Sequence, residues 1–111
     1  MTLESSENLA ELSLDTANQN ELTTVDALII GAGFAGMYML HSLTNSGLNV
    51  LVLEEGDGVG GTWYWNRYPG ARCDVPSVEY SYSFSDELQQ AWEWSSKYSS
   101  QPEILYYANH V

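Results

Sequence analysis

The sequence has few basic residues. Lys and Arg together number 3 against 15 Asp and Glu, so the 111-residue chain carries a formal net charge of −12. Proteins that bind nucleic acid need clustered positive charge to neutralise phosphates. The composition therefore argues against a nucleic-acid partner.

Cysteine and long apolar segments are also scarce. The single cysteine, Cys73, has no partner for an internal disulfide, and no group of residues has metal-ligand spacing, so we predict no metal site. No apolar run reaches the ~18 residues typical of a membrane span. The first residues carry acids rather than the basic start of a signal peptide. We therefore expect a cytoplasmic protein without a membrane span.

An apolar run that ends in a glycine turn is the main feature that is present. Val25–Ile30 is short and rich in β-branched residues, which predicts a buried parallel strand of roughly residues 24–30. The turn that follows is Gly-x-Gly-x-x-Gly: Gly31 permits the tight turn, Gly33 allows a pyrophosphate to approach the backbone, and Gly36 allows close helix packing. A helix is expected from about residue 35 to 46, with an N-terminus that favours phosphate.

A second expected strand, Asn49–Glu54, ends in an acid 18 positions after Gly36. A carboxylate about 20 residues beyond such a turn accepts hydrogen bonds from a ribose. Glu54 and Glu55 both qualify, and we choose Glu54 because it directly ends the strand. An acid there favours the free ribose of FAD or NAD over the phosphorylated ribose of NADP. The alternative is a glycine-rich turn in an unrelated α/β protein.

These elements predict an α/β fold built on a Rossmann-like strand–helix–strand unit. Residues 1–23 contain acids but no Lys or Arg, and we expect them to form an acidic, disordered tail. Residues 24–111 are expected to be the N-terminal part of a dinucleotide-binding domain. The sequence ends inside an expected amphipathic helix without a glycine C-cap, so we expect this domain to be truncated.

The stretch from residue 60 to residue 74 is the least common part of the sequence. Trp63, Tyr64 and Trp65 lie in a row, and two arginines precede Asp74. One interpretation is a loop whose aromatic rings complete a small core, but it leaves the arginines unexplained. A buried or half-buried Arg–Asp arrangement is expected where a phosphate or cofactor is oriented.

The remaining residues predict a strand and two helices. Pro69–Gly70 fits the centre of a type II turn. Aromatic residues at period two in Asp74–Ser85 indicate a strand. Ser85 has the character of a helix N-cap, and Pro102 lies near the first position of the last helix.

Residues 61–74 read Gly-x-Trp-x-x-x-Arg-Tyr-Pro-Gly-x-x-x-Asp, 25 residues after the first glycine motif. This pattern resembles the Baeyer–Villiger monooxygenases, of the cyclohexanone and phenylacetone monooxygenase types. The segments Tyr80–Ser85, Trp92–Ser95 and Gln101–Leu105 are similar to that family as well. The resemblance covers about residues 24–111.

The resemblance implies a flavin-dependent monooxygenase with an FAD-binding, Rossmann-like domain. In that family FAD is reduced by NADPH, O₂ reacts, and oxygen is inserted beside the carbonyl of a ketone to give an ester or lactone. The family's second glycine motif, its signature segment and a later arginine are absent from these 111 residues. We therefore expect this chain alone to be inactive.

The resemblance also implies site residues. Asp74 is similar to the active-site aspartate that orients the later arginine, which stabilises negative charge on the oxygenated flavin. The residues implied on the NADP side are Arg72, Cys73 and Asp74. Those implied to contact FAD are Gly31, Gly33, Ala35, Gly36, Glu54, Thr62, Trp63, Tyr64, Trp65, Asp74 and Tyr80.

Three other interpretations stay open. Related flavin monooxygenases oxidise nitrogen or sulfur, and share the first glycine motif. A non-catalytic, truncated dinucleotide-binding fragment agrees with the length. An NAD-dependent dehydrogenase agrees with the first motif only, and it leaves the loop from Trp63 to Asp74 without a role.

Overall fold

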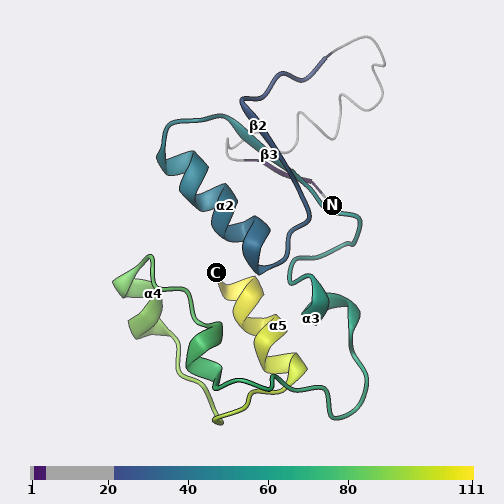
Figure 1. The fold of residues 1–111 in the computed structure, drawn as a ribbon, viewed down its shortest axis with the longest axis vertical. Coiled ribbons are helices and arrows are strands. Elements are labelled where there is room, and N and C mark those ends of the chain that lie inside the picture. Colours follow the sequence, from purple (N-terminus) through teal and green to yellow (C-terminus); the bar gives the residue numbers. More distant parts are fainter. Residues whose placement is uncertain (1, 5–21) are drawn as a thin grey trace. The chain divides into compact units, whose positions relative to one another are not determined.

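The structure is a computed structural model, which describes residues 2–4 and 22–111. It contains two compact units, Met1–Gly58 and Val59–Val111 (Figure 1). The expected tail, residues 1–23, lies mostly outside the described residues. Within it, Thr2–Glu4 forms strand β1, which the sequence did not predict. The treatment of residues 24–111 as one domain stays a prediction.

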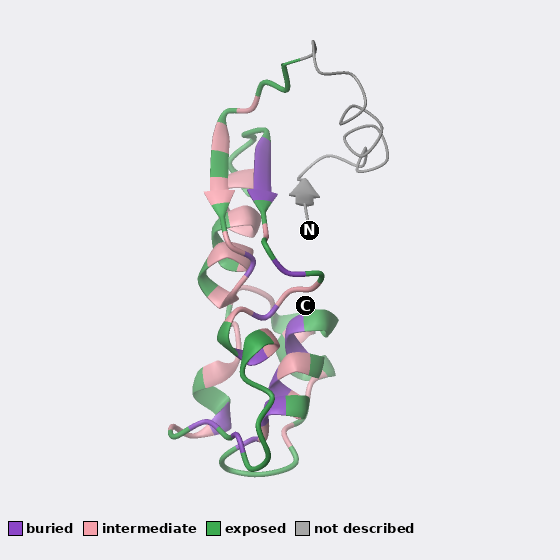
Figure 2. Cartoon of the chain, turned by 90° about the vertical axis from the view of Figure 1, so that its right-hand side faces the viewer, coloured by how far each residue is buried: buried purple, intermediate pink, exposed green. Residues whose placement is uncertain are grey.

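A three-stranded sheet forms the centre of the first unit. Strands β2 (Ala27–Ile30) and β3 (Val50–Leu53) pair in parallel, with Ala27 opposite Val50. Strand β1 pairs antiparallel with the other edge of β3, so the order is β1-β3-β2. The central position of β3 explains its continuous apolar sequence. Figure 2 shows this difference in burial: β3 is buried along most of its length, whereas β2 alternates between intermediate and exposed.

Helix α2 (Phe34–Asn45) connects the two parallel strands and contacts both of them. It ends at Asn45 with Ser46 as its C-cap residue, and Gly47 follows with a φ of +85° that a residue with a side chain rarely adopts. The Gly47 N–H donates to the Thr44 carbonyl at 2.9 Å. The strand–helix–strand unit is therefore as the sequence predicts, with bounds that differ by a few residues.

The second unit consists of short helices and ordered loops. Its helices are α3 (Thr62–Trp65), a 3₁₀ helix (Ser77–Tyr80), α4 (Asp86–Ala91) and α5 (Gln101–His110). The Ser85 hydroxyl accepts from the Leu88 N–H at 3.2 Å, which confirms the predicted N-cap of α4. Pro102 lies in the first turn of α5, as predicted. The side chains of Trp63, Ala71, Cys73, Ile104, Tyr107 and Ala108 form the buried core.

The predicted strand within Asp74–Ser85 is wrong. The chain turns into the 3₁₀ helix after Pro76, whose φ is −55°, and the N–H of Glu79 donates to the Pro76 carbonyl at 2.9 Å. Further along, the N–H of Tyr82 donates to the Tyr107 hydroxyl at 2.8 Å instead of to a neighbouring strand. Tyr80 packs against Trp63 of α3, and Tyr82 packs against Tyr107 of α5. The alternation of aromatic residues therefore reflects contacts with helices and not a strand.

Residues 71–73 run beside residues 98–101. Arg72 and Ser100 form an antiparallel bridge, and the Cys73 N–H donates to the Ser99 carbonyl at 3.0 Å. The turn that precedes this pairing has Gly70 at a φ of +83° and a hydrogen bond from the Ala71 N–H to the Tyr68 carbonyl at 3.2 Å. The predicted turn at Pro69–Gly70 therefore forms, with glycine where a type II turn requires it.

Across the described residues, none of the helices has the length and apolar character needed to cross a bilayer.

Candidate functional site

The glycine turn between β2 and α2 depends on the absence of side chains. Gly31 has a φ of +98°, and its N–H donates to the Leu53 carbonyl at 2.7 Å, which ties the turn to β3. A Cβ on Gly36 would overlap the Gly31 carbonyl oxygen and would lie 3.6 Å from the Ile29 side chain. The first turn of α2 therefore packs directly on the glycine turn, which is the role predicted for Gly36.

Helix α2 begins at this turn without a side-chain cap. Gly33 is its N-cap residue, and the first turn contains no acid. The N-terminus of a helix attracts an anion through its backbone N–H groups and its dipole. Ala35 is exposed in this first turn, whereas Gly33 and Gly36 are half-buried. The start of α2 thus has the chemistry of a phosphate-binding turn.

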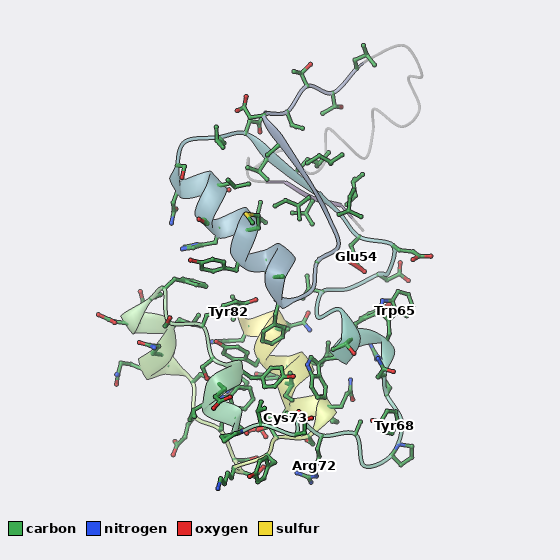
Figure 3. The ribbon with its side chains drawn as sticks, in the orientation of Figure 1. Glu54, Trp65, Tyr68, Arg72, Cys73 and Tyr82 are labelled. Carbon is green, nitrogen blue, oxygen red and sulfur yellow. The ribbon has the colours of Figure 1, made fainter. Side chains whose placement is uncertain are left out.

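Glu54 lies where β3 ends, at the same edge of the sheet as the glycine turn. Its Oε2 accepts a hydrogen bond from the Ala32 N–H at 2.7 Å, and its Oε1 accepts from the Gly56 N–H at 3.3 Å. The side chain is half-buried, and Figure 3 labels it beside the loop that follows β3. These bonds hold the carboxylate beside the glycine turn, and an ionised carboxylate is an acceptor for hydroxyl groups.

The aromatic row in the second unit is divided between the core and the surface. Trp63 is 9% exposed and packs edge-on against Tyr80, with ring centroids 5.5 Å apart. Trp65 is 58% exposed and packs edge-on against Tyr64 at 4.9 Å (Figure 3). The interpretation of these rings as part of a small core therefore holds for Trp63 but not for Trp65.

Arg67 contacts this row from the end of α3. Its guanidinium carbon lies 4.7 Å from the centre of the Tyr64 ring, and its Nε donates to the Tyr64 carbonyl at 2.7 Å. A cation over a tyrosine ring is attracted by the negative face of the ring. Arg67 therefore stabilises Tyr64 and leaves the larger ring of Trp65 exposed.

The expected buried or half-buried Arg–Asp arrangement is wrong. Arg72 and Asp74 are both exposed, and the Arg72 guanidinium donates to the Tyr98 carbonyl at 2.8 Å (Figure 3). Cys73, which lies between them, is buried. Side chains alternate sides along an extended segment, so Cys73 faces the core while Arg72 and Asp74 face outward. The exposed Arg72 guanidinium on that outer side has the charge to attract an anionic ligand.

Three buried polar residues behind the aromatic row were missed by the sequence analysis. The Ser77 and Ser99 hydroxyls lie 2.7 Å apart, and the Gln101 side-chain amide donates to the Trp63 carbonyl at 2.6 Å. These residues carry no recognisable motif spacing, because their role depends on contacts between segments far apart in the sequence.

Two groups near this network have shifted pKa values. Burial raises the pKa of Tyr107, although the hydrogen bond from the Tyr82 backbone opposes this. For Glu103, burial also opposes ionisation, but hydrogen bonds from Ser95 and Ser99 and the charge of Arg72 outweigh it and lower the pKa. The Glu103 carboxylate accepts from both the N–H and the hydroxyl of Ser95 at 2.8 Å. The Glu103 carboxylate thus holds Ser95, in the loop before α5, in place.

The predicted site residues thus belong to both units. The first unit contains Gly31, Gly33, Ala35, Gly36 and Glu54, and the second contains Thr62, Trp63, Tyr64, Trp65, Arg72, Cys73, Asp74 and Tyr80.

A sequence profile described as an NAD(P)-binding Rossmann-like domain matches residues 29–93. Three similar curated proteins are monooxygenases. Phenazine N-monooxygenase PhzNO1 of Lysobacter antibioticus is 53% identical over 83% of this chain and 17% of its own length. Acetone monooxygenase (methyl acetate-forming) of Gordonia sp. is 49% identical over 80% and 17%. A Baeyer–Villiger monooxygenase of Pseudooceanicola batsensis is 53% identical over 78% and 16%.

Two solved structures are similar to this chain as well. A steroid monooxygenase bound to NADP is 59% identical and superposes with a TM-score of 0.77, over 79% of this chain and 17% of that one. The protein OTEMO in complex with FAD and NADP is 46% identical with a TM-score of 0.73, over 81% and 17%. The resemblance to Baeyer–Villiger monooxygenases and the α/β, Rossmann-like fold are confirmed. This chain spans about one sixth of the length of these relatives.

Proposed function

This chain belongs to the family of NAD(P)-binding Rossmann-like domains, and we propose that it is the FAD-binding segment of a monooxygenase that uses FAD and NADPH. The observation that carries the proposal is the pairing of the glycine turn with Glu54. The Glu54 carboxylate bonds to the Ala32 N–H at 2.7 Å, beside a helix that begins without a side-chain cap. Phosphate and ribose are bound by those two features in dinucleotide-binding folds.

The residues of the first unit fit the adenosine diphosphate half of FAD. A side chain at Gly36 would overlap the Gly31 carbonyl, so the helix start lies close enough to the turn for a pyrophosphate to reach both. Gly31, Gly33, Ala35 and Gly36 bind the pyrophosphate in this proposal. Glu54 accepts hydrogen bonds from the ribose hydroxyls and keeps its contact with the turn.

The residues of the second unit fit the flavin half. Trp65 and Tyr64 offer an exposed and a half-buried ring, and a planar ligand can pack against such rings. Thr62, Trp63 and Tyr80 complete the proposed FAD contacts. When bound and reduced by NADPH, FAD supplies the chemistry that activates O₂.

Arg72, Cys73 and Asp74 form the proposed NADP side. Arg72 is an exposed cation in a chain with few of them, and it is fixed by its bond to the Tyr98 carbonyl. A guanidinium suits phosphate groups. Asp74 is the proposed catalytic residue: an exposed carboxylate can hold an arginine in the orientation that stabilises an anion.

The proposed reaction is insertion of oxygen beside the carbonyl of a small-molecule ketone. Acetone monooxygenase, 49% identical to this chain, supports it. A cytoplasmic location belongs to the same proposal, supported by a single cysteine without an internal partner.

A segment exchange tests this proposal. In the Gordonia acetone monooxygenase, the matching segment is replaced by this chain. We expect the purified chimera to hold flavin and to consume NADPH when acetone is added. The same chimera with Gly36→Val is the matched control and is expected to lose flavin. A folded chimera without bound flavin would contradict the proposal.

N-oxidation is a second candidate, because phenazine N-monooxygenase PhzNO1 is 53% identical to this chain. The same segment exchange in that enzyme separates the two. If only one of the two chimeras is active, the reaction of the enzyme used for that chimera is favoured. Equal activity in both would mean that this segment serves either reaction and that the substrate is selected elsewhere.

The remaining alternative is a fragment that does not bind the cofactor. Calorimetric titration of the 111-residue chain with FAD addresses it directly. Tight, stoichiometric binding by this chain would exclude a non-binding fragment. Absence of heat, together with a chimera that holds flavin, would mean that FAD needs contacts beyond these residues.

A further inference from the structure

Gln101 bonds to both ends of the loop that carries the aromatic row. Its side-chain Nε2 donates to the Trp63 carbonyl at 2.6 Å, and its backbone N–H donates to the Ala71 carbonyl at 2.8 Å. The residue is 6% exposed and is the first residue of α5. A single buried residue therefore connects α5 to the start and to the end of this loop.

Helix α3 needs such a contact because it is too short to be stable alone. It has four residues, a single turn, and its N-cap Gly61 provides no side-chain bond. Isolated helices of this length do not form in water, since the first turn fixes several residues for one hydrogen bond. The orientation of α3 therefore depends on contacts from outside it.

Two apolar contacts and one polar contact supply that orientation. The Trp63 ring packs edge-on against Tyr80, and Gly60 lies so close to α5 that a Cβ on it would be 2.8 Å from Leu105 Cδ1. These apolar contacts fix how close α3 lies to the 3₁₀ helix and to α5, but they tolerate sliding. The amide bond from Gln101 is directional, so it also fixes the rotation of the turn.

We propose that Gln101 is a positioning residue, whose side-chain amide sets the orientation of α3 and so keeps Trp65 exposed for a ligand. The effect of Gln101 on flavin binding rests on the proposed function, whereas its effect on the orientation of α3 does not. The role requires an N–H donor, because the group it meets is a carbonyl oxygen. Methionine has a similar length without a donor, and glutamate has the same shape but donates only when it is protonated.

Hydrogen exchange of the full 111-residue chain tests this proposal without any ligand. The amides of residues 63–66 are bonded within the α3 turn, so their exchange reports whether α3 is held. In Gln101→Met we expect them to exchange about tenfold faster or more, because a buried carbonyl loses its donor. The amides of α5 should keep the rates of the wild type. Gln90→Met, on the exposed side of α4, is the matched control and should change neither.

Glutamate at position 101 distinguishes a requirement for a hydrogen-bond donor from a requirement for side-chain shape. In Gln101→Glu we expect the protection factors of residues 63–66 to be low near pH 8. They should recover toward pH 5, as the buried carboxyl becomes protonated and can donate. Gln101→Met should show no such recovery. At pH 5, where the glutamate is neutral, a residue that matters only for packing would leave the two variants alike.

Two results would overturn the proposal. One is unchanged exchange of residues 63–66 in Gln101→Met. The other is a uniform loss of protection across the second unit, which would make Gln101 a stability residue. Flavin binding is read separately, in the chimera with acetone monooxygenase: a folded chimera that holds no flavin counts against the proposed function, while α3 exchange in the 111-residue chain still decides the role of Gln101.

Discussion

The carboxylate of Glu54 accepts a hydrogen bond from the backbone N–H of Ala32 at 2.7 Å, and so connects the end of β3 to the glycine turn after β2. The two residues are 22 positions apart in the sequence. The contact places a fixed negative charge beside the turn that would bind a pyrophosphate. It also means that Glu54 holds the turn in its bent form before any ligand arrives, so the site is organised in advance.

Glu54→Gln is expected to weaken FAD binding. The variant loses the charge that strengthens the bonds to the Ala32 N–H and to the ribose, which costs about 1–2 kcal/mol. The expected change is therefore about tenfold in the dissociation constant of FAD, measured by calorimetry on the chimera with acetone monooxygenase. Glu55→Gln is the matched control, because Glu55 is exposed and adjacent. A larger effect at Glu55 would assign the ribose to the other acid.

Gly36→Ala is expected to destabilise the first unit by ~1–3 kcal/mol. Helix propensity alone predicts the opposite sign, since alanine is favoured over glycine inside a helix by about 1 kcal/mol. Overlap of the new Cβ with the Gly31 carbonyl decides the sign. All four tryptophans lie in the second unit, so urea unfolding of this variant is followed by far-ultraviolet circular dichroism. A stabilised variant would show that α2 can move away from the turn.

Trp63 and Trp65 are expected to respond oppositely to alanine. Trp63→Ala removes a buried ring and should destabilise the second unit by ~3–5 kcal/mol. Trp65→Ala removes an exposed ring and should leave stability within about 0.5 kcal/mol of the wild type. In the chimera, Trp65→Ala should lower flavin affinity by roughly 3- to 10-fold. Urea unfolding monitored by fluorescence, together with flavin titration, measures both. Equal losses of stability would contradict the division of the aromatic row.

The elements that depend mainly on neighbouring residues could be predicted from the sequence alone. Val50–Val52 is apolar on both faces and therefore reads as a central parallel strand, and the glycines at 31 and 47 adopt the positive φ that their turns need. The acid at Glu54 was placed correctly at the strand end, because strand length and spacing fix it. These features need only neighbouring residues or one crossover to be recognised.

The parts that were missed depend on distant contacts. Tyr80, Tyr82 and Phe84 alternate like a strand, but Tyr80 contacts Trp63 and Tyr82 contacts Tyr107 of α5 rather than a second strand. The Gln101 side chain is buried and donates to the Trp63 carbonyl, whereas the exposed Arg72 side chain donates to the Tyr98 carbonyl. The residue pattern of one segment does not show which distant residue its side chains will contact.

Acid is expected to weaken the second unit through protonation of Glu103. Glu103 has a lowered pKa in the folded chain, because hydrogen bonds from Ser95 and Ser99 and the charge of Arg72 outweigh the effect of burial. The unfolded chain then binds more protons than the folded chain near the ordinary glutamate pKa of about 4.3, so the stability of the second unit rises with pH there. The contribution of Glu103 is fully present above that ordinary value and is lost as the pH falls through the lowered one. Urea unfolding followed by fluorescence between pH 6 and pH 3 should show a shallower pH dependence in Glu103→Gln than in the wild type. Glu93→Gln, which removes the same charge from an exposed residue, should keep the wild-type slope, and equal slopes in all three proteins would refute the role of Glu103.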